Sequence, residues 1–326
     1  MGGDFAPANV VRGAVDALRE QGGRITPILV GQEPRIRAEL DRLSWNGKDG
    51  LEVVHASEVV EMHDSPNTAL KAKKDSSIVV GVGLHRDRKG DAFVSAGNTG
   101  AVLSASTLIL GRLKGVSRPT IGALFPTEGS PCFLVDAGAN VDCKPRHLYE
   151  FGVMGSVYVS ALVGKAEPTV GLLSIGEEDG KGNEVTMEAM EMFRKSRLNF
   201  IGNVEGRDIL KGKVDVAVCD GFVGNILLKF GESVPGFLKS RLKEFAETGL
   251  WNKIRLLMAQ GGLRAVLKKL DYQEYGGVPL LGVNGVSIIG HGGSTPKAIK
   301  NMILRAEEMV RWSINEKIQE AMGTHG

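Results

Sequence analysis

Short apolar runs rich in β-branched residues alternate with longer segments of helical spacing along most of the chain. The strand-like runs lie at residues 25–31, 91–97, 132–138, 169–176, 199–204 and 214–221, and a helix-like segment follows each of them. Alternation of this kind is typical of a mostly parallel sheet with helices on both faces. The sequence therefore predicts an α/β fold.

Composition limits the classes of protein to which this chain can belong. The chain has 326 residues, 42% of them hydrophobic, and a formal net charge of +2. It is long enough for one large α/β domain or two smaller ones, and its small net charge does not favour a nucleic-acid partner. We find no charged and apolar leader and no run of the roughly 18 to 20 apolar residues that cross a bilayer. We therefore expect neither a secreted nor a transmembrane protein.

The cysteines carry no recognisable pattern. Cys132, Cys143 and Cys219 are widely spaced and form no CxxC motif. This spacing argues against a disulfide framework and against a common zinc site, and it fits a reducing cytoplasm. No GxSxG elbow, catalytic triad order or nucleophilic-cysteine signature is present. We expect no metal, no cofactor and no covalent intermediate.

Four glycine-rich segments stand where an apolar run ends and a helical pattern begins. They read SAGNTG (95–100), DAGAN (136–140), SIGEEDGKGNE (174–184) and DGFVGN (220–225). One such glycine is ordinary turn chemistry, but ligands of α/β sheets bind at the carboxyl ends of strands. A fifth segment, MGGD (1–4), stands in the same position before a helix that begins after Pro7 and ends at Gly22 and Gly23. These segments predict a ligand site.

The residue types in these loops favour an anion as the ligand. Glycines let backbone amides approach a ligand, and a helix N-terminus adds free N–H groups and about half a positive charge. In SAGNTG, the side chains of Ser95, Asn98 and Thr99 can join the amide of Gly100 around a phosphate. The motif is neither GxGxxG nor GxxxxGK[ST], so nucleotide binding finds no direct support. Lys181, between glycines in EEDGKGNE, is either a solvated charge or an electrostatic clamp beside the anion.

A basic helical segment interrupts the strand–helix alternation between Gly236 and Tyr275. It contains eight Lys and Arg residues and four Asp and Glu residues, a balance of 8 − 4 = +4. Apolar residues recur in it at helical spacing beside the lysines and arginines. Such stripes form a core, a dimer interface, a membrane-binding face or a docking surface for an acidic protein. We interpret the segment as a helical arm inserted at 236–275 into one large α/β domain of residues 1–326.

Taken together, the motifs resemble those of one family. MGGDFAP, SAGNTG, RPTIGALFPT, DAGANVDCKP, GVMGSVY, GNE, NFIGNVEGRD, DGFVGN and YGG, in this order, are similar to the bacterial phosphate acyltransferases of phospholipid synthesis, the PlsX family, over essentially the whole chain. The resemblance implies transfer of a long-chain acyl group from acyl carrier protein to inorganic phosphate. It also implies a homodimeric three-layer α/β/α fold, similar to isocitrate and isopropylmalate dehydrogenases and to phosphotransacetylases, in a cytoplasmic protein loosely associated with the inner face of the membrane.

Two segments depart from simple expectation. The resemblance implies a short strand that ends in Asp-Ala immediately before MGGD. We expect this strand to be missing from the sequence. Without it, the sequence does not fix the positions of Gly2, Gly3 and Asp4. The valine-rich segment 77–87 has the composition of a strand, whereas the resemblance implies a helix. Gly81 and Gly83 would weaken that helix by about 1 kcal/mol each relative to alanine. We predict the helix.

The expected roles follow from the resemblance and the loop chemistry together. The residues predicted to be catalytic are Lys181, Asp136, Asn183 and Asn225. Those predicted to bind phosphate or substrate are Gly2, Gly3, Asp4, Ser95, Asn98, Thr99, Gly100, Asn140 and Asp220. Those predicted to contact a membrane or acyl carrier protein are Ile254, Leu257, Met258, Val266 and Lys268. The proton acceptor is Asp4 or Asp136. A short-chain phosphotransacetylase that uses coenzyme A and a non-catalytic membrane-associated scaffold are the alternatives.

Overall fold

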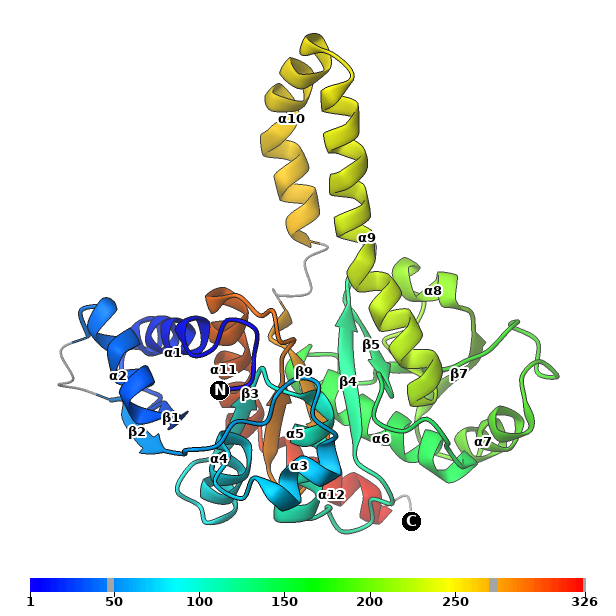
Figure 1. Ribbon diagram of the computed structural model, residues 1–326. Coiled ribbons are helices and arrows are strands. Elements are labelled where there is room, and N and C mark those ends of the chain that lie inside the picture. The colour runs from blue at the N-terminus through cyan, green and yellow to red at the C-terminus, as the bar shows by residue number, and fades with distance from the viewer. Residues whose placement is uncertain (46–49, 270–274, 325–326) are drawn as a thin grey trace.

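A mixed sheet of eight strands lies at the centre of the molecule in the computed structural model, which describes residues 1–45, 50–269 and 275–324. Across the sheet the strands are β3 (Ala92–Ser95), β10 (Val286–Ile289), β9 (Val278–Leu281), β4 (Thr120–Phe125), β5 (Cys132–Val135), β8 (Val216–Val218), β6 (Thr169–Leu173) and β7 (Asn199–Val204). Two further strands, β1 (Ile28–Gly31) and β2 (Glu52–His55), pair in parallel beside it (Figure 1).

Strand direction reverses in the middle of this sheet. β3 and β10 are parallel, as are β5, β8, β6 and β7, but β9 and β4 pair in antiparallel fashion with each other and with their other neighbours β10 and β5. Consequently β3 and β5 run in opposite directions. Their carboxyl ends lie at opposite ends of the strand ladder, which the alternation in the sequence did not indicate.

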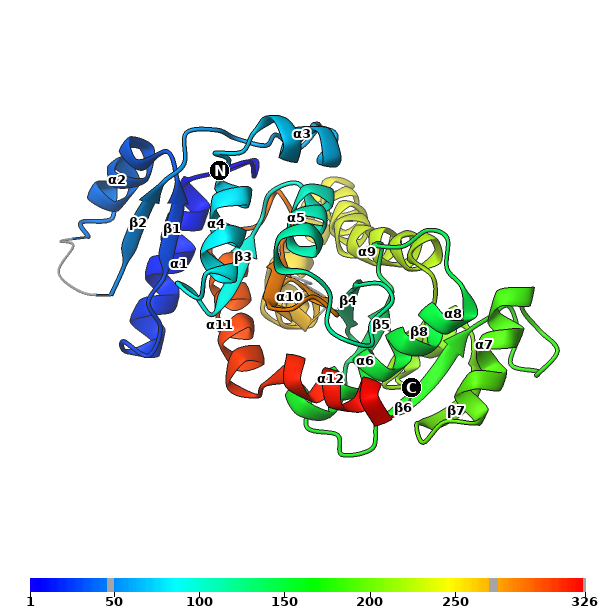
Figure 2. The ribbon, with the colours of Figure 1, turned by 90° about the horizontal axis from the view of Figure 1, so that it is seen from below.

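Helices cover both faces of the eight-stranded sheet and enclose an apolar core on each face. One core contains Phe133, Tyr158 and Phe193, and α6 (Pro145–Leu162), α7 (Glu184–Arg194), α11 (Pro296–Arg311) and α12 (Ile314–Thr324) enclose it. The other contains Phe93 and Leu134, and it lies under α3 (Pro66–Ala72), α4 (Ser77–Arg86), α5 (Thr99–Ala105), α8 (Gly206–Lys211) and the first turns of α9 (Gly221–Glu247). The predicted α/β fold with helices on both faces is confirmed (Figure 2).

Helices near the N-terminus follow the sequence signals. α1 (Ala8–Gln21) begins after Pro7, ends at Gly22 in a left-handed conformation with φ of 57°, and packs on α11. α2 (Glu33–Arg42) follows β1, and a π-helical segment, η1 (Ser106–Leu110), extends α5. Segment 77–86 is the helix α4 and not a strand. A Cβ on Gly81 would lie 2.5 Å from the Phe93 ring, so this glycine lets the helix approach the sheet.

The arm is a helical hairpin that projects from the body (Figure 1). It consists of α9 and α10 (Leu250–Lys269), which pack side by side. α9 begins at Gly221, beside the sheet, and continues past Pro235 without a break. The helix that carries the arm therefore starts well before Gly236, where the sequence predicted the arm to begin. None of the described helices is both long and apolar enough to span a membrane.

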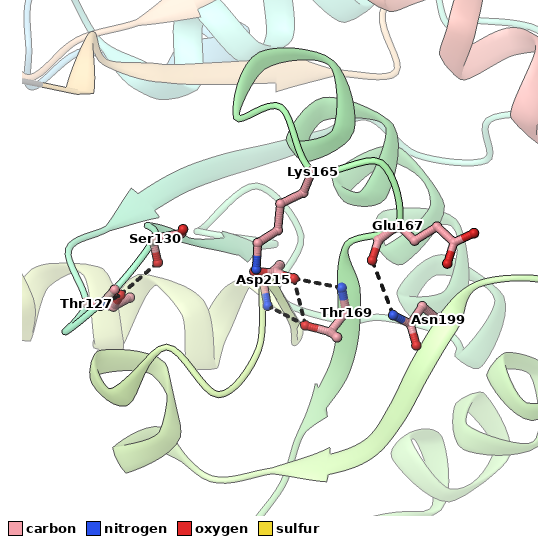
Figure 3. Close-up of polar contacts among 8 residues, drawn as sticks. Thr127, Ser130, Lys165, Glu167, Thr169, Asn199 and Asp215 are labelled. Atoms are coloured by element: carbon pink, nitrogen blue, oxygen red, sulfur yellow. Dashed lines mark hydrogen bonds and ion pairs between the residues drawn. The ribbon is translucent and has the colours of Figure 1, made fainter.

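An ion pair centred on the buried Asp215 carboxylate ties three neighbouring strands together at the end where they begin (Figure 3). The Asp215 carboxylate accepts hydrogen bonds from Lys165 Nζ at 2.6 Å and from the backbone N and Oγ1 of Thr169, both at 2.9 Å. The Asp215 carbonyl accepts a hydrogen bond from Phe133 N at 2.7 Å. These contacts fix the start of β8 between β5 and β6, and β8 leads directly to Asp220.

The Asp215 contacts predict an acid-sensitive component of stability. Burial acts to raise the pKa of Asp215, but Lys165 and Thr169 outweigh burial and lower the pKa below its ordinary value. Stability from this carboxylate is therefore complete above the unfolded pKa of about 3.9 and is lost as the pH falls through the folded pKa. At pH 7 we expect Asp215→Asn to lower the free energy of unfolding by about 1 to 3 kcal/mol in urea titrations.

The difference in free energy of unfolding between wild type and Asp215→Asn should become smaller when the urea titrations are repeated between about pH 5 and pH 2. Protonation of Asp215 in the wild type removes the same charge that the substitution removes. Asp16→Asn is the matched control, since Asp16 pairs with Arg12 on the exposed surface of α1. A constant difference between wild type and Asp215→Asn at every pH would contradict the assignment.

Candidate functional site

The residues that follow β5 form a compact buried cluster around Asp136. The Asp136 carboxylate is fully buried and accepts five hydrogen bonds. Four come from the backbone N–H groups of Ile121, Gly138, Ala139 and Asn140, and the fifth comes from Asn140 Nδ2 at 2.8 Å. Burial raises the pKa of Asp136, and the bonds from Ala139, Asn140 and Gly138 oppose this rise. Both carboxylate oxygens are therefore committed to holding the loop.

Asp220 and the start of α9 pack directly on this cluster. Asp220 is the N-cap of α9, and its Oδ1 accepts a hydrogen bond of 2.8 Å from the backbone N three residues on. Gly221 N donates to Asn140 O at 2.7 Å. A Cβ on Gly224 would lie 1.8 Å from Asp136 O, so only glycine allows α9 to come this close. The glycines of DGFVGN thus serve helix packing.

Asn225 is the exposed member of this group. It lies on the first turns of α9, and a Cβ built on Gly138 would be 3.3 Å from both Cβ and Oδ1 of Asn225. Asn225 therefore borders the loop after β5, and the structure gives its side chain no hydrogen-bond partner among the described residues. A free amide beside the N-terminus of a long helix is available to a ligand.

Cys143 is close to the same carboxylates but is not activated. Its thiol donates to Asn140 O at 3.5 Å. Burial, followed by the charges of Asp136 and Asp220, raises the pKa of Cys143 to about 12. The thiol therefore stays protonated at neutral pH, in keeping with the absence of a nucleophilic-cysteine motif.

Lys181 and Asn183 lie on the loop between β6 and α7. The Lys181 side chain is exposed, and no hydrogen bond or ion pair of its Nζ is found in the described part of the chain. The Lys181 carbonyl accepts hydrogen bonds from Ser174 Oγ and Asn203 Nδ2. Asn183 is the N-cap of α7 and accepts a hydrogen bond from Thr186 N at 2.9 Å. The loop thus presents a free ammonium group on a fixed backbone.

β5, β8 and β6 are parallel neighbours, so the loops that follow them share one end of the sheet. Six of the predicted residues lie on these loops: Asp136, Asn140, Lys181, Asn183, Asp220 and Asn225. Contacts join the segments of Asp136, Asn140, Asp220 and Asn225, whereas Lys181 and Asn183 stand on the loop after the next strand. Of these, Lys181 and Asn225 have side chains with no hydrogen-bond partner among the described residues, whereas the side-chain oxygens of Asp136, Asp220 and Asn183 and the amide of Asn140 hold backbone. We call this group the β5–β8–β6 end.

The N-terminal loop forms a second group with the ends of β3 and β10. Asp4 N donates to Gly292 O at 2.9 Å. A Cβ on Gly2 would lie 2.1 Å from Val60 O, and one on Gly3 would lie 2.9 Å from Ala96 O. Both glycines are therefore required by close packing on neighbouring backbone. The Asp4 side chain itself is exposed.

The SAGNTG loop belongs to this second group. Asn98 is buried and caps α5: its Oδ1 accepts from Ala101 N, and its Nδ2 donates to three backbone carbonyls between residues 61 and 64. Ser95 Oγ accepts from Gly97 N at 3.1 Å. Thr99 is exposed, and a Cβ on Gly100 would meet the Pro66 ring at 2.6 Å. The Asn98 amide therefore has no free donor for an anion, whereas the hydroxyl of exposed Thr99 can donate to one.

The two groups do not merge into one contact network. The group around Asp4, Ser95 and Thr99 lies where β3 and β10 end, and the β5–β8–β6 end lies at the opposite end of the ladder. No hydrogen bond or ion pair joins them within the described ranges. α5, which follows the first group, and α9, which follows Asp220, pack on the same core, so a substrate that contacts both groups would have to extend across the sheet.

Sequence analysis missed a cation and several apolar residues near the β5–β8–β6 end. Arg118, just before β4, donates to Asp142 O at 3.3 Å and, after burial, acts to lower the pKa of His147. Arg118 belongs to the motif RPTIGALFPT, but the motif alone assigns no role to its arginine. The exposed apolar side chains at or beside this end are Val141, Ile175, Phe222 and Ile226.

The arm carries most of the predicted contact residues on its surface. Leu257 is 59% exposed, Met258 83%, and Val266 61%, while Ile254 is 36% exposed. The side chain of Lys268 lies outside the described residues. Such a large exposed apolar surface is typical of an interaction site.

The layered body defines the class of fold. The crystal structure of a phosphotransacetylase from Streptococcus pyogenes superposes with a TM-score of 0.64 at 18% identity, covering 94% of this chain and 92% of that one. The EutD phosphotransacetylase from Staphylococcus aureus gives a TM-score of 0.58 at 14% identity, with coverage of 93% and 92%. The chain therefore has a phosphotransacetylase-like fold; its assignment to the isocitrate and isopropylmalate dehydrogenase class remains a prediction.

Sequence comparison identifies the family. A family model described as fatty acid synthesis protein matches residues 1–317. A protein of Pelotomaculum thermopropionicum named phosphate acyltransferase is 50% identical over 322 residues, which are 99% of this chain and 93% of that protein. One of the same name from Chlorobaculum tepidum is 47% identical and is covered to 100%. The chain belongs to this family of fatty acid synthesis proteins.

Proposed function

We propose that this protein is a phosphate acyltransferase that moves a long-chain acyl group from acyl carrier protein to inorganic phosphate and forms acyl phosphate for phospholipid synthesis. The observation that carries the proposal is identity of 47 to 50% over nearly the whole chain with relatives that bear the name phosphate acyltransferase. The distant phosphotransacetylases support the fold alone.

The reaction needs positioning more than chemical activation. A thioester carbonyl is already reactive, and thiolate is a fair leaving group, so the protein must hold phosphate against the carbonyl and stabilise the oxyanion. Alignment can supply about 7 to 11 kcal/mol, and one oxyanion donor about 2.7 to 4 kcal/mol. Lys181 and Asn225, which have free donors at the β5–β8–β6 end, are proposed to serve the phosphate and the oxyanion. Neither step requires a metal or a covalent nucleophile.

Four other predicted residues at the β5–β8–β6 end are proposed to have supporting roles. Asn183, Asp220, Asn140 and Asp136 cap helices or hold loops, so they would orient the groups that touch substrate. Both Asp136 oxygens are occupied, so of the two predicted proton acceptors only exposed Asp4 has a carboxylate with no partner in the described structure. Because Asp4 belongs to the other group, it would serve only a substrate that reaches across the sheet from the β5–β8–β6 end.

Apolar surface beside these polar groups suits a long-chain donor. Ile175 is 83% exposed on the loop of Lys181, and Phe222 is 58% exposed on the first turn of α9. Burying a side chain of this size against an acyl chain contributes about 1.5 to 3 kcal/mol. A short acetyl group would gain little from such contacts, which favours a long-chain acyl donor over the coenzyme A alternative.

The test is phosphate-dependent loss of a long-chain acyl carrier protein thioester, with acyl phosphate measured directly. We expect one acyl phosphate for each thioester lost, and no reaction without phosphate. Faster turnover of acetyl coenzyme A than of the long-chain thioester would favour the phosphotransacetylase alternative. Vesicle binding without thioester loss from either donor would favour the scaffold.

The arm is proposed to handle the amphiphilic product and the carrier protein. Acyl carrier protein is acidic, and the arm holds an excess of basic residues, which would steer association. Exposed Leu257, Met258 and Val266 would give reversible attachment to the inner face of the cytoplasmic membrane. A homodimer, implied by the family resemblance, is part of the same proposal.

Replacing Leu257 and Met258 together with glutamate should abolish binding to anionic phospholipid vesicles in a sedimentation assay. The two charges would have to enter the headgroup region, while turnover with soluble substrates should stay within about twofold, because neither residue lies near the β5–β8–β6 end. Leu108→Glu is the control, since Leu108 is 74% exposed on η1, away from the arm. Undiminished vesicle binding by the double variant would assign the stripe to protein packing.

A further inference from the structure

The contacts that hold the Lys181 loop to the rest of the protein are of two kinds, exposed ion pairs and one buried side chain. It connects β6 to α7, contains Gly176, Gly180 and Gly182, and is mostly exposed. Ion pairs join it to the body, with Lys213 Nζ 2.9 Å from Glu177 and Arg194 2.6 Å from Asp179. Because all four side chains are substantially exposed, solvent screens these pairs, and they contribute little to holding the backbone.

Asn203 is the buried contact of this loop. Its side chain comes from β7 and is only 4% exposed. Its Nδ2 donates to Glu178 O at 2.9 Å and to Lys181 O at 3.2 Å. Lys181 N in turn donates to Glu178 O at 3.0 Å, closing a four-residue turn. One amide group therefore holds both ends of the turn at whose last position Lys181 stands.

A bulge in β7 directs this side chain. The pairing of β6 with β7 shifts register so that Val170 and Leu172 face Phe200 and Asn203, which places one extra residue in β7. Gly202, within the bulge, has φ of 96°. Bulges of this kind redirect a side chain, and here Asn203 and Val204 are both buried in place of the usual alternation.

Asn203 Oδ1 is buried without a hydrogen-bond partner among the described residues. Exchanging the amide oxygen and nitrogen would direct the oxygen at two carbonyl oxygens, so the two accepting carbonyls fix the orientation. A buried unpaired acceptor is unfavourable, and fold stability alone does not account for an asparagine here.

We propose that Asn203 is a positioning residue for Lys181, directed by the Gly202 bulge. The inference rests on the proposed function of Lys181 at the β5–β8–β6 end. Without Asn203, the turn would lose its buried support and Lys181 would sample positions away from the reacting phosphate.

The test is a double-mutant cycle on phosphate-dependent thioester turnover at saturating substrates. We expect Asn203→Ala to lower kcat about 10- to 30-fold, and to change it less than twofold when Lys181 is already alanine. Asn199→Ala is the matched control, because Asn199 is on the same strand and donates to Glu167 O at 3.2 Å, away from the loop (Figure 3). Equal losses from Asn203→Ala in both backgrounds would overturn the proposal.

Hydrogen exchange tests the same inference without any activity. In Asn203→Ala, the amide of Lys181 should exchange at least tenfold faster, whereas Asn199→Ala should leave it unchanged. An unaltered exchange rate in Asn203→Ala would refute the positioning role even if the enzyme works as proposed. Faster exchange together with full activity of Lys181→Ala would contradict the role proposed for Lys181, and with it the catalytic part of this inference.

Discussion

Lys181→Ala is expected to lower kcat for acyl phosphate formation by about 100- to 1,000-fold, the usual effect of removing one preorganised charge or donor from a transition state. The Lys181 Nζ has no partner in the described structure, so its removal should leave the fold intact. Turnover at saturating phosphate and acyl donor separates this effect from weaker substrate binding, and a urea titration checks the fold.

Lys195→Ala provides the control for this measurement. Lys195 is an exposed lysine at the other end of α7, and no ion pair of its side chain is found in the described structure. Its replacement should leave kcat within twofold of wild type. If Lys181→Ala turned over as fast as Lys195→Ala, the ammonium group would be a solvated surface charge and the proposed transition-state role would be wrong.

Asp136→Ala is expected to destabilise the protein by roughly 4 kcal/mol or more, an exceptional effect for one substitution. Removal of the carboxylate would leave the backbone N–H groups of Ile121, Gly138, Ala139 and Asn140 with no acceptor in a buried place. Each unpaired buried donor costs about 1 to 3 kcal/mol before relaxation. The midpoint of urea unfolding measures the change.

Two variants make the Asp136 measurement specific. Asp136→Asn keeps the shape and one acceptor oxygen, so its stability should lie between those of wild type and Asp136→Ala. Asp142→Ala changes an exposed aspartate that lies six residues further on, and should stay within about 0.5 kcal/mol of wild type. Equal stability of Asp136→Ala and Asp142→Ala would show that the hydrogen bonds of Asp136 are dispensable.

Local signals predicted much of the fold. β-branched runs marked β3, β5, β6 and β7, and Pro7 and Gly22 bounded α1, because these features depend on nearest neighbours. β2, β4, β9 and β10 were not predicted as strands. Glycine or proline flanks or enters β4, β9 and β10, and no local pattern shows whether a buried strand pairs in parallel or antiparallel. The antiparallel pairing of β9 and β4 therefore could not be predicted from the sequence.

The candidate site was harder to predict because capping and ligand binding use the same residue types. Asn98, Asn183 and Asp220 stand at strand-to-helix junctions, and all three accept a backbone hydrogen bond as N-caps. The pattern alone fits either role. Lys181 and Asn203 lie 22 residues apart in the sequence, and only the pairing of β6 with β7 brings them together.

The continuity of α9 has a mechanical consequence. Its 27 residues form one helix about 40 Å long. This one helix therefore connects the first turn, beside Asn140, to the far tip of the arm. Tilting the whole helix by about 5° about its first turn displaces its far end by about 3 Å and barely moves Asn225. Pro235 removes one backbone hydrogen bond within the helix and marks the place where the helix bends most easily. The arm can therefore follow an uneven or moving surface while the polar groups at its base keep their spacing.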